Sequence, residues 1–197
     1  MRFLFGAGRP CLDFTRTVRE RRGEMTEGLT LPADLARWVE EAALPVRLRA
    51  ERLTSEDVET ARRLREAVYD VVRARAAGRA PSAADVRLLN AHAAHAPPAP
   101  SLLPRGDGVE WAADDPLQAV LAFLARDAID LAASPAIARV RECADPRCTS
   151  LFLDTSRPGK RRWCSAMPCA NRQKVRAYRA RRGSGGGGGS GEGGGAG

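Results

Sequence analysis

Residues 143–172 read CADPRCTSLFLDTSRPGKRRWCSAMPCANR and contain four of the five cysteines in this 197-residue chain. The cysteines form two close pairs, Cys143-x4-Cys148 and Cys164-x4-Cys169, separated by an insert of hairpin size. Zinc in structural sites takes four such ligands in a tetrahedron. The spacing therefore predicts one Zn²⁺ ion held by four thiolates, with two disulfides or four unrelated thiols as the alternatives.

The predicted zinc is structural, because four thiolates fill the coordination sphere and leave no position for an activated water. The insert is expected to form a hairpin, with strands at residues 151–153 and 161–163 and a turn at residues 156–159. After Cys169 the sequence contains no helix breaker before Gly183, so a helix should follow the last ligand. This order of elements is treble-clef-like, and metal binding should supply much of the folding free energy of so small a segment.

Positive charge is concentrated in the same segment. The whole chain has 32 Lys+Arg and 24 Asp+Glu, a formal net charge of +8. Residues 139–182 contain 13 basic and 3 acidic side chains, whereas residues 1–138 contain 19 and 20. The sequence therefore predicts a near-neutral domain at 1–138 and a basic zinc module at 139–182. The glycine-rich tail at 183–197 has nothing to bury and is expected to be disordered.

The charge of the zinc module makes nucleic acid its expected partner. On the predicted helix, Arg172, Arg176 and Arg179 share one face. Asn171 is the candidate nearest to a base edge, although it could instead cap the helix. The candidate contacts are Arg161, Arg162, Asn171, Arg172, Lys174, Arg176 and Arg179. DNA is the first expectation. The alternatives are an RNA- or ribosome-associated module, a basic helix that docks on an acidic protein surface, and a basic helix that is merely solvated.

Residues 1–138 are predicted to be mainly helical with short strands, so the fold class is α+β. Helical periodicity and start signals place helices at 32–43 and 55–77, with two more opening near residues 82 and 115. Weak alternation suggests a strand at 11–18, and Arg105-Gly106-Asp107-Gly108 suggests a hairpin turn within 101–111.

Other candidate sites in the first domain are less specific. Asp13 and Arg16 could line a ligand pocket, or serve only the structure. His92 and His95 are three residues apart on one predicted helix, but no third metal ligand accompanies them, which favours a packing or surface role. Cys11 is expected to be a small buried hydrophobic residue. We find no nucleophile–base pair or phosphate-binding loop, so no enzyme activity is expected.

The residues around the cysteines closely resemble the CGNR zinc finger. The stretches GAGRPCLDFTRTV at 6–18 and LPADLARWV at 31–39 are similar to the ABATE domain, which precedes this finger in bacterial proteins. The resemblance implies a transcription regulator whose zinc finger, with the four cysteines as ligands, binds DNA. It also implies that the helical domain either senses an unidentified small-molecule effector or mediates association with other protein chains. A homodimer is one such association. The chain departs from the family at Ala170, where the family has Gly, and at Arg16, where Asn is usual.

The sequence lacks an apolar stretch of the roughly 20 residues that a transmembrane helix needs. Its first residues, MRFLFGAGRPCLD, do not contain the apolar region of a secretory signal. Paired thiols without an export signal indicate a reducing compartment. We therefore expect a cytoplasmic protein without a membrane partner.

Overall fold

The computed structural model describes residues 2–164, 169, 173, 175 and 178. Contacts within the chain define two compact units, residues 1–164 and 165–197, and each unit is described by itself. In the second unit the described residues Cys169, Gln173, Val175 and Tyr178 are helical. The predicted disorder of residues 183–197 concerns positions outside the described residues.

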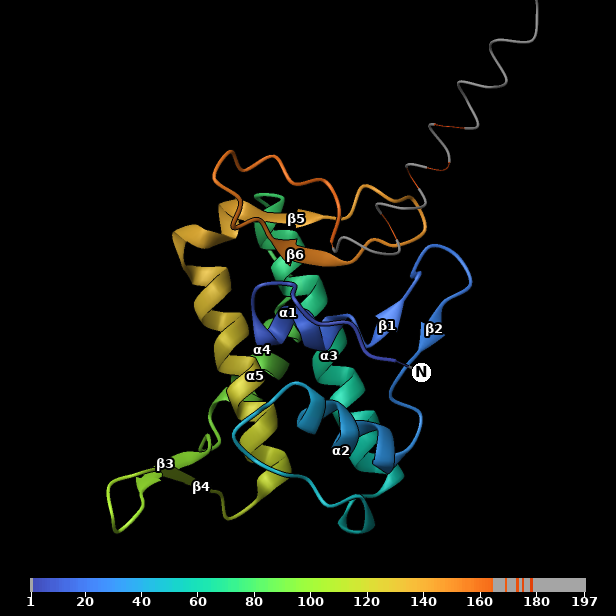
Figure 1. The fold of residues 1–197 in the computed structure, drawn as a ribbon. Helices are drawn as coiled ribbons and strands as arrows, with labels where there is room; N and C mark the ends of the chain where they lie inside the picture. Colours follow the sequence, from blue (N-terminus) through green and yellow to red (C-terminus); the bar gives the residue numbers. More distant parts are fainter. Residues whose placement is uncertain (1, 165–168, 170–172, 174, 176–177, 179–197) are drawn as a thin grey trace, which may run out of the picture. The chain divides into compact units, whose positions relative to one another are not determined.

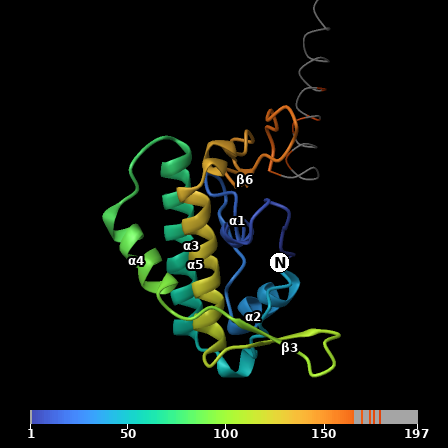
Figure 2. The ribbon, with the colours of Figure 1, turned by 90° about the vertical axis from the view of Figure 1, so that its left-hand side faces the viewer.

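The first unit is built on three helices that pack against one another, α3 (Ser55–Ala76), α4 (Ala83–Ala93) and α5 (Pro116–Ala133). A short helix, α1 (Pro10–Thr15), packs against both α3 and α5 (Figures 1 and 2). The apolar positions that recur at helical spacing lie in this core, including Leu64, Val68, Leu121 and Leu124, all fully buried. This arrangement confirms the expectation of a mainly helical domain.

Both long helices begin where the sequence signals predict. Thr54 and Asp57 form a reciprocal capping box at the start of α3, in which the Asp57 amide donates to Thr54 Oγ1 over 3.2 Å. Asp115 caps α5 by accepting a 3.0 Å hydrogen bond from the Gln118 amide, and Pro116 occupies the first helical position. The capping side chains are therefore found at the backbone positions where these two helices begin.

The helical core is extended by α2 (Pro32–Glu41) and by two 3₁₀ turns, η1 (Ala50–Arg52) and η2 (Pro135–Arg139). Trp38 of α2 is fully buried and its ring centroid lies 5.0 Å from that of Phe14 in α1. This aromatic pair joins α2 to the core.

Three two-stranded antiparallel sheets complete the first unit. Strand β1 (Val18–Arg19) pairs with β2 (Thr26–Glu27), and β5 (Val140–Glu142) pairs with β6 (Leu151–Leu153). The hairpin of β3 (Ala99–Leu102) and β4 (Val109–Ala112) confirms the turn predicted within 101–111. All eight of its strand residues are exposed, and it projects away from helices α3, α4 and α5 in Figures 1 and 2.

Two predictions for this domain are wrong. Residues 10–15 form helix α1 rather than part of a strand, because Pro10 occupies the first helical position and Cys11, Leu12 and Phe14 are all buried within a short helix. His95 does not share a helix with His92, since α4 ends at Ala93.

No helix in the described part of the chain combines the length and apolar character needed to cross a bilayer.

Candidate metal centre and its surroundings

The four cysteine sulfurs predicted to bind zinc cluster tightly. The Sγ atoms of Cys143, Cys148, Cys164 and Cys169 all lie within 4.8 Å of one another, and all four residues are buried. None forms a disulfide, which removes that alternative. Tetrahedral zinc with Zn–S bonds of about 2.3 Å requires sulfurs about 3.8 Å apart. The Sγ atoms of Cys148 and Cys164 are 3.6 Å apart, so the donor set fits Zn²⁺.

The first ligand pair is held by a turn that follows β5. Asp145 is buried, its carbonyl oxygen accepts from the Cys148 amide over 3.0 Å, and its Oδ1 accepts from the Arg147 amide over 3.1 Å. The Cys143 amide donates to the Ser150 carbonyl over 2.9 Å. The Ser150 hydroxyl oxygen lies 3.2 Å from Cys148 Sγ, where it can donate to a thiolate. These contacts orient two of the four sulfurs.

The insert between the ligand pairs differs from the predicted hairpin in one strand. Residues 151–153 form β6, and a turn closes at residues 156–159, where Gly159 has φ of +61° and its amide donates to the Ser156 carbonyl. Residues 161–163 do not form the return strand, and β6 pairs with β5 instead. The reason lies in other partners: the Arg161 amide donates to Asp154 Oδ2 over 2.9 Å, and the Arg162 carbonyl accepts from the Ala144 amide.

Asp154 organises this insert. It is fully buried, and its carboxylate accepts from the hydroxyl and the amide of Ser156 as well as from the Arg161 amide. The Ser156 hydroxyl, 2.6 Å from Oδ1, is the main cause of a lowered pKa of Asp154. The carboxylate is thus charged and accepts hydrogen bonds from backbone amides. No local sequence pattern indicates this role, because the course of the folded chain brings the three donors to Asp154.

The described candidate nucleic-acid contacts differ in their surroundings. Arg161 Nε donates to the Trp163 carbonyl over 2.8 Å, Nη2 donates to the Cys164 carbonyl, and the guanidinium carbon lies 4.7 Å from the Phe152 ring centroid. Arg162 is exposed, with its guanidinium carbon 5.4 Å from the ring centroid of Trp163. Arg161 therefore holds the loop before a zinc ligand, whereas Arg162 is open to solvent.

The remaining predicted contacts belong to the basic helix after the last ligand. Asn171, Arg172, Lys174, Arg176 and Arg179 all lie outside the described residues, as does Ala170. Their roles stay predictions from the sequence.

Helix α3 and the N-terminal segment both contact the β5–β6 part of the zinc module. The Tyr69 hydroxyl donates to the Thr149 carbonyl over 3.1 Å, and Arg73 Nε donates to Glu142 Oε2 over 3.2 Å. The Leu153 amide donates to the Ala7 carbonyl over 2.8 Å. The sequence did not predict these contacts, because a tyrosine among apolar residues at helical spacing indicates only a place in the core.

The GAGRP segment and α1 use their polar groups to fix the fold. Arg9 Nε donates to Asp127 Oδ1 over 2.8 Å, and the Cys11 amide donates to Asp127 Oδ2 over 2.9 Å. Gly8 has φ of +95°, and a Cβ there would lie 3.0 Å from Leu153 Cβ. Only glycine therefore combines this backbone conformation with the close approach to β6. Cys11 is fully buried, as expected for a small hydrophobic residue.

Asp13 and Arg16, the candidate pocket residues, lie together. Arg16 Nη1 is 3.5 Å from Asp13 Oδ1 and donates to the Phe5 carbonyl over 3.1 Å. The Arg16 side chain is only 1% exposed, and its Nε and Nη2 find no hydrogen-bond partner within the described part of the chain. Burial is the main influence on Asp13 and raises its pKa, despite the hydrogen bond from the Ala7 amide and the charge of Arg16. A ligand role for this pair stays a prediction.

His92 does not resemble a metal ligand in the described structure. Burial and the neighbouring charges of His95 and Arg63 lower its pKa. The metal-ligand cluster found among the described residues comprises the four zinc-module cysteines and contains neither histidine. His92 is 9% exposed, consistent with a packing role.

Comparison with known families accounts for nearly the whole chain. Residues 8–135 match the model of the ABATE family, described as "putative stress-induced transcription regulator", and residues 139–182 match the CGNR zinc finger. No curated protein matches the chain. Neither family is an enzyme family. The zinc-finger match and the four clustered sulfurs together support one structural zinc ion held by Cys143, Cys148, Cys164 and Cys169. The chain therefore belongs to the ABATE family and carries a CGNR zinc finger after its ABATE domain.

Proposed function

We propose that the protein is a cytoplasmic transcription regulator that binds DNA through its zinc finger. The observation that carries this proposal is the excess positive charge of the zinc module. Residues 139–164 contain seven arginine and lysine residues, and none of them forms a salt bridge within the described part of the chain. A surface of this kind favours contact with a phosphate backbone.

The three acidic residues of the module each take part in contacts of their own. Glu142 forms salt bridges with Arg22 and Arg73, whereas Asp145 and Asp154 are buried and accept hydrogen bonds from the module's own backbone. Four thiolates and one Zn²⁺ ion would remove two charges from the net +10 of residues 139–182. About +8 would remain to attract a polyanion.

Within this proposal the predicted basic helix makes the DNA contacts. Arg172, Arg176 and Arg179 contact phosphates or a groove, with Lys174 beside them, and Asn171 lies near a base edge. Arg162 adds a contact from the insert. Arg161 instead positions the loop around Cys164, because its guanidinium is engaged by backbone carbonyls. The ABATE domain then serves sensing or association, with a homodimer as one form of the latter.

The test is a salt titration of binding to a duplex DNA of random sequence, measured by fluorescence anisotropy between about 50 mM and 200 mM salt. The double variant Arg176→Ala/Arg179→Ala should flatten the dependence of log K on log salt by about 1.8, because each lost phosphate contact changes the slope by about 0.9. Arg79→Ala/Arg87→Ala is the matched control. It removes the same charge from exposed arginines of the helical domain and should leave the slope unchanged.

Two results would contradict the proposal. One is the absence of duplex binding at the lowest salt concentration by protein shown to contain zinc. The other is an equal change of slope in the control, which would indicate attraction to overall charge rather than to the finger. A structured RNA that displaces the duplex at lower concentration than unlabelled duplex would favour the RNA alternative.

A further inference from the structure

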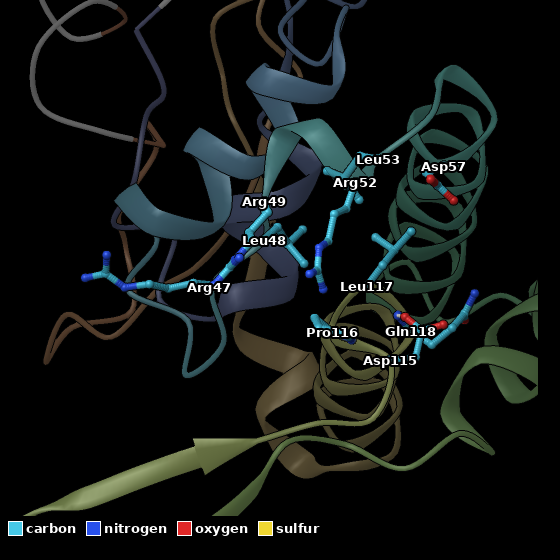
Figure 3. Close-up of a pocket in the computed structure, with 10 residues that line it drawn as sticks. All are labelled: Arg47, Leu48, Arg49, Arg52, Leu53, Asp57, Asp115, Pro116, Leu117 and Gln118. Atoms are coloured by element: carbon cyan, nitrogen blue, oxygen red, sulfur yellow. Dashed lines mark hydrogen bonds between the residues drawn. The ribbon is translucent and has the colours of Figure 1, made fainter.

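We propose that the ABATE domain binds a small organic anion with an apolar body in a pocket between η1 and the first turn of α5. The pocket has a volume of 320 Å³. It is lined by residues of the segment 47–53, by the start of α3 and by residues 115–118 (Figure 3). Its volume lies at the lower end of the range of about 300–1,000 Å³ for small-molecule sites. The site is separate from the zinc module and does not depend on the function proposed above.

The pocket has an apolar part. Leu48, Leu53, Pro116 and Leu117 contribute to its wall. Leu117 is buried, and Leu48 and Leu53 are half-buried. Burial of an acyl chain or aromatic ring against these side chains is favourable, because it removes apolar surface from water. This part of the pocket selects for a ligand with an apolar body.

The same pocket has a cationic part. Arg49 and Arg52 are exposed, and neither side chain forms a salt bridge or hydrogen bond with any residue that the structure describes. In Figure 3, Arg52 reaches from η1 toward the start of α5, whereas Arg47 extends away from Leu117. Arg47 Nη1 instead lies 3.8 Å from Glu40 Oε1. Arg49 and Arg52 are thus free to hold a carboxylate or another anionic head group.

The two carboxylates in the lining do not supply partners for these arginines. Asp57 Oδ2 accepts from the amide and hydroxyl of Thr54 at the start of α3. Asp115 Oδ1 accepts from the Gln118 amide at the start of α5. Both are capping residues at helix N-termini, where the helix dipole favours negative charge. Both carboxylates are therefore engaged at helix starts, and neither forms a salt bridge with Arg49 or Arg52.

The combination defines the ligand class. Arg49 and Arg52 supply donors for an anionic head, and the neighbouring leucines supply a surface for an apolar tail. A free sugar lacks both the negative charge and the apolar body, and a polyamine has the wrong charge for Arg49 and Arg52. The class that fits is a compact organic anion, such as a medium-chain or aromatic carboxylate.

The test uses the full-length zinc-loaded protein and three probes with the same eight-carbon tail, namely octanoate, octan-1-ol and octylammonium. Binding is measured by isothermal titration calorimetry. Octanoate should bind tightest, octan-1-ol about fivefold to tenfold more weakly because it lacks the charge, and octylammonium weakest of all. Equal binding of octanoate and octan-1-ol, or no octanoate binding at concentrations near its solubility limit, would overturn the proposal.

Variants then locate the site. Arg52→Gln and Arg49→Gln should each weaken octanoate binding by about fivefold to tenfold while leaving octan-1-ol binding unchanged, because only the charged head is affected. Arg79→Gln is the control, since Arg79 is also exposed but lies outside the pocket. The substituted side chains are exposed, so unchanged far-UV circular dichroism is expected for all three variants. An unchanged octanoate affinity in both pocket variants would place the ligand elsewhere and refute the assignment.

Discussion

The hydroxyl of Tyr69, within helix α3, donates a buried hydrogen bond to the backbone carbonyl of Thr149, which directly follows the zinc ligand Cys148. Thr149 has φ of +53°, an uncommon conformation for a β-branched residue. This contact places the first ligand pair of the zinc finger in the same packed unit as the ABATE helices.

Tyr69→Phe tests the energetic importance of this contact. The variant keeps the ring, and with it the apolar packing and the cation–π contact of Arg21, but removes the only donor that Tyr69 offers the Thr149 carbonyl. A buried carbonyl without a partner should lower the free energy of unfolding by about 1–2 kcal/mol. Urea denaturation of the zinc-loaded protein measures the difference. An unchanged midpoint would mean that the hydrogen bond contributes nothing to stability.

Removal of zinc is expected to affect more than the finger itself. The contacts of Tyr69 with Thr149 and of Arg73 with Glu142 link the module to α3, so chelation should lower the melting temperature of the helical unit. Most of the helical circular dichroism should persist at low temperature, because the core of α3, α4 and α5 contains no metal ligand. Circular dichroism melts before and after chelation, with zinc release followed by a metal indicator, provide the measurement. A melting temperature that stays the same after complete zinc release would show that the two parts fold independently.

Asp154→Asn should destabilise the insert between the ligand pairs. The amide retains the size of the carboxylate but replaces one acceptor oxygen with a donor, which then faces either the Ser156 donors or the Arg161 amide. We expect a lower urea midpoint, because charge-assisted hydrogen bonds from Ser156 and Arg161 are disrupted. Asp107→Asn, at the exposed β3–β4 turn, is the matched control and should be neutral. Equal stability of the two variants in urea would contradict the organising role of Asp154.

Glu27 and Arg65 predict a specific pH dependence. Burial alone would raise the pKa of Glu27, but the paired hydrogen bonds from Arg65, both 2.7 Å, outweigh it and hold the pKa below its ordinary value. The stabilisation is therefore fully present above the unfolded-state pKa of about 4.3 and is lost as the pH falls through the lower folded-state value. Glu27→Gln should lower the free energy of unfolding at neutral pH, and the difference from the parent protein should shrink towards acid pH. Urea denaturation at several pH values below neutrality checks this, and a difference that is constant with pH would refute it.

Much of the helical architecture is predictable from local sequence signals. Thr54 with Asp57, and Asp115 with Pro116, mark the starts of α3 and α5, because a helix start needs acceptors for its first amides and these residues supply them locally. The zinc ligands are predictable for a similar reason. Cys143 and Cys148 lie close in sequence, so their spacing alone indicates that they bind the same metal ion.

The failures of local reasoning have a shared cause. Residues 161–163 suit a strand, yet the Arg161 amide is taken by Asp154 and the Arg162 carbonyl by Ala144. Alternation around Cys11 suggests a strand, yet Pro10 begins a short helix that buries its side chains against α3 and α5. The first outcome depends on partners outside residues 161–163, and the second depends on the packing of α1 against α3 and α5 as well as on Pro10.

The family, the four zinc ligands, the basic character of the finger and the helical nature of the first domain all follow from the amino-acid sequence alone. These properties reside in residue type and short-range spacing. Three features appear only in the folded chain: β6 pairs with β5, Tyr69 donates to the carbonyl of Thr149, and Arg49 and Arg52 lie beside an apolar pocket with no acidic partner among the described residues. Those properties depend on which distant backbone and side-chain groups meet once the apolar faces of the helices are buried, and no local pattern encodes them.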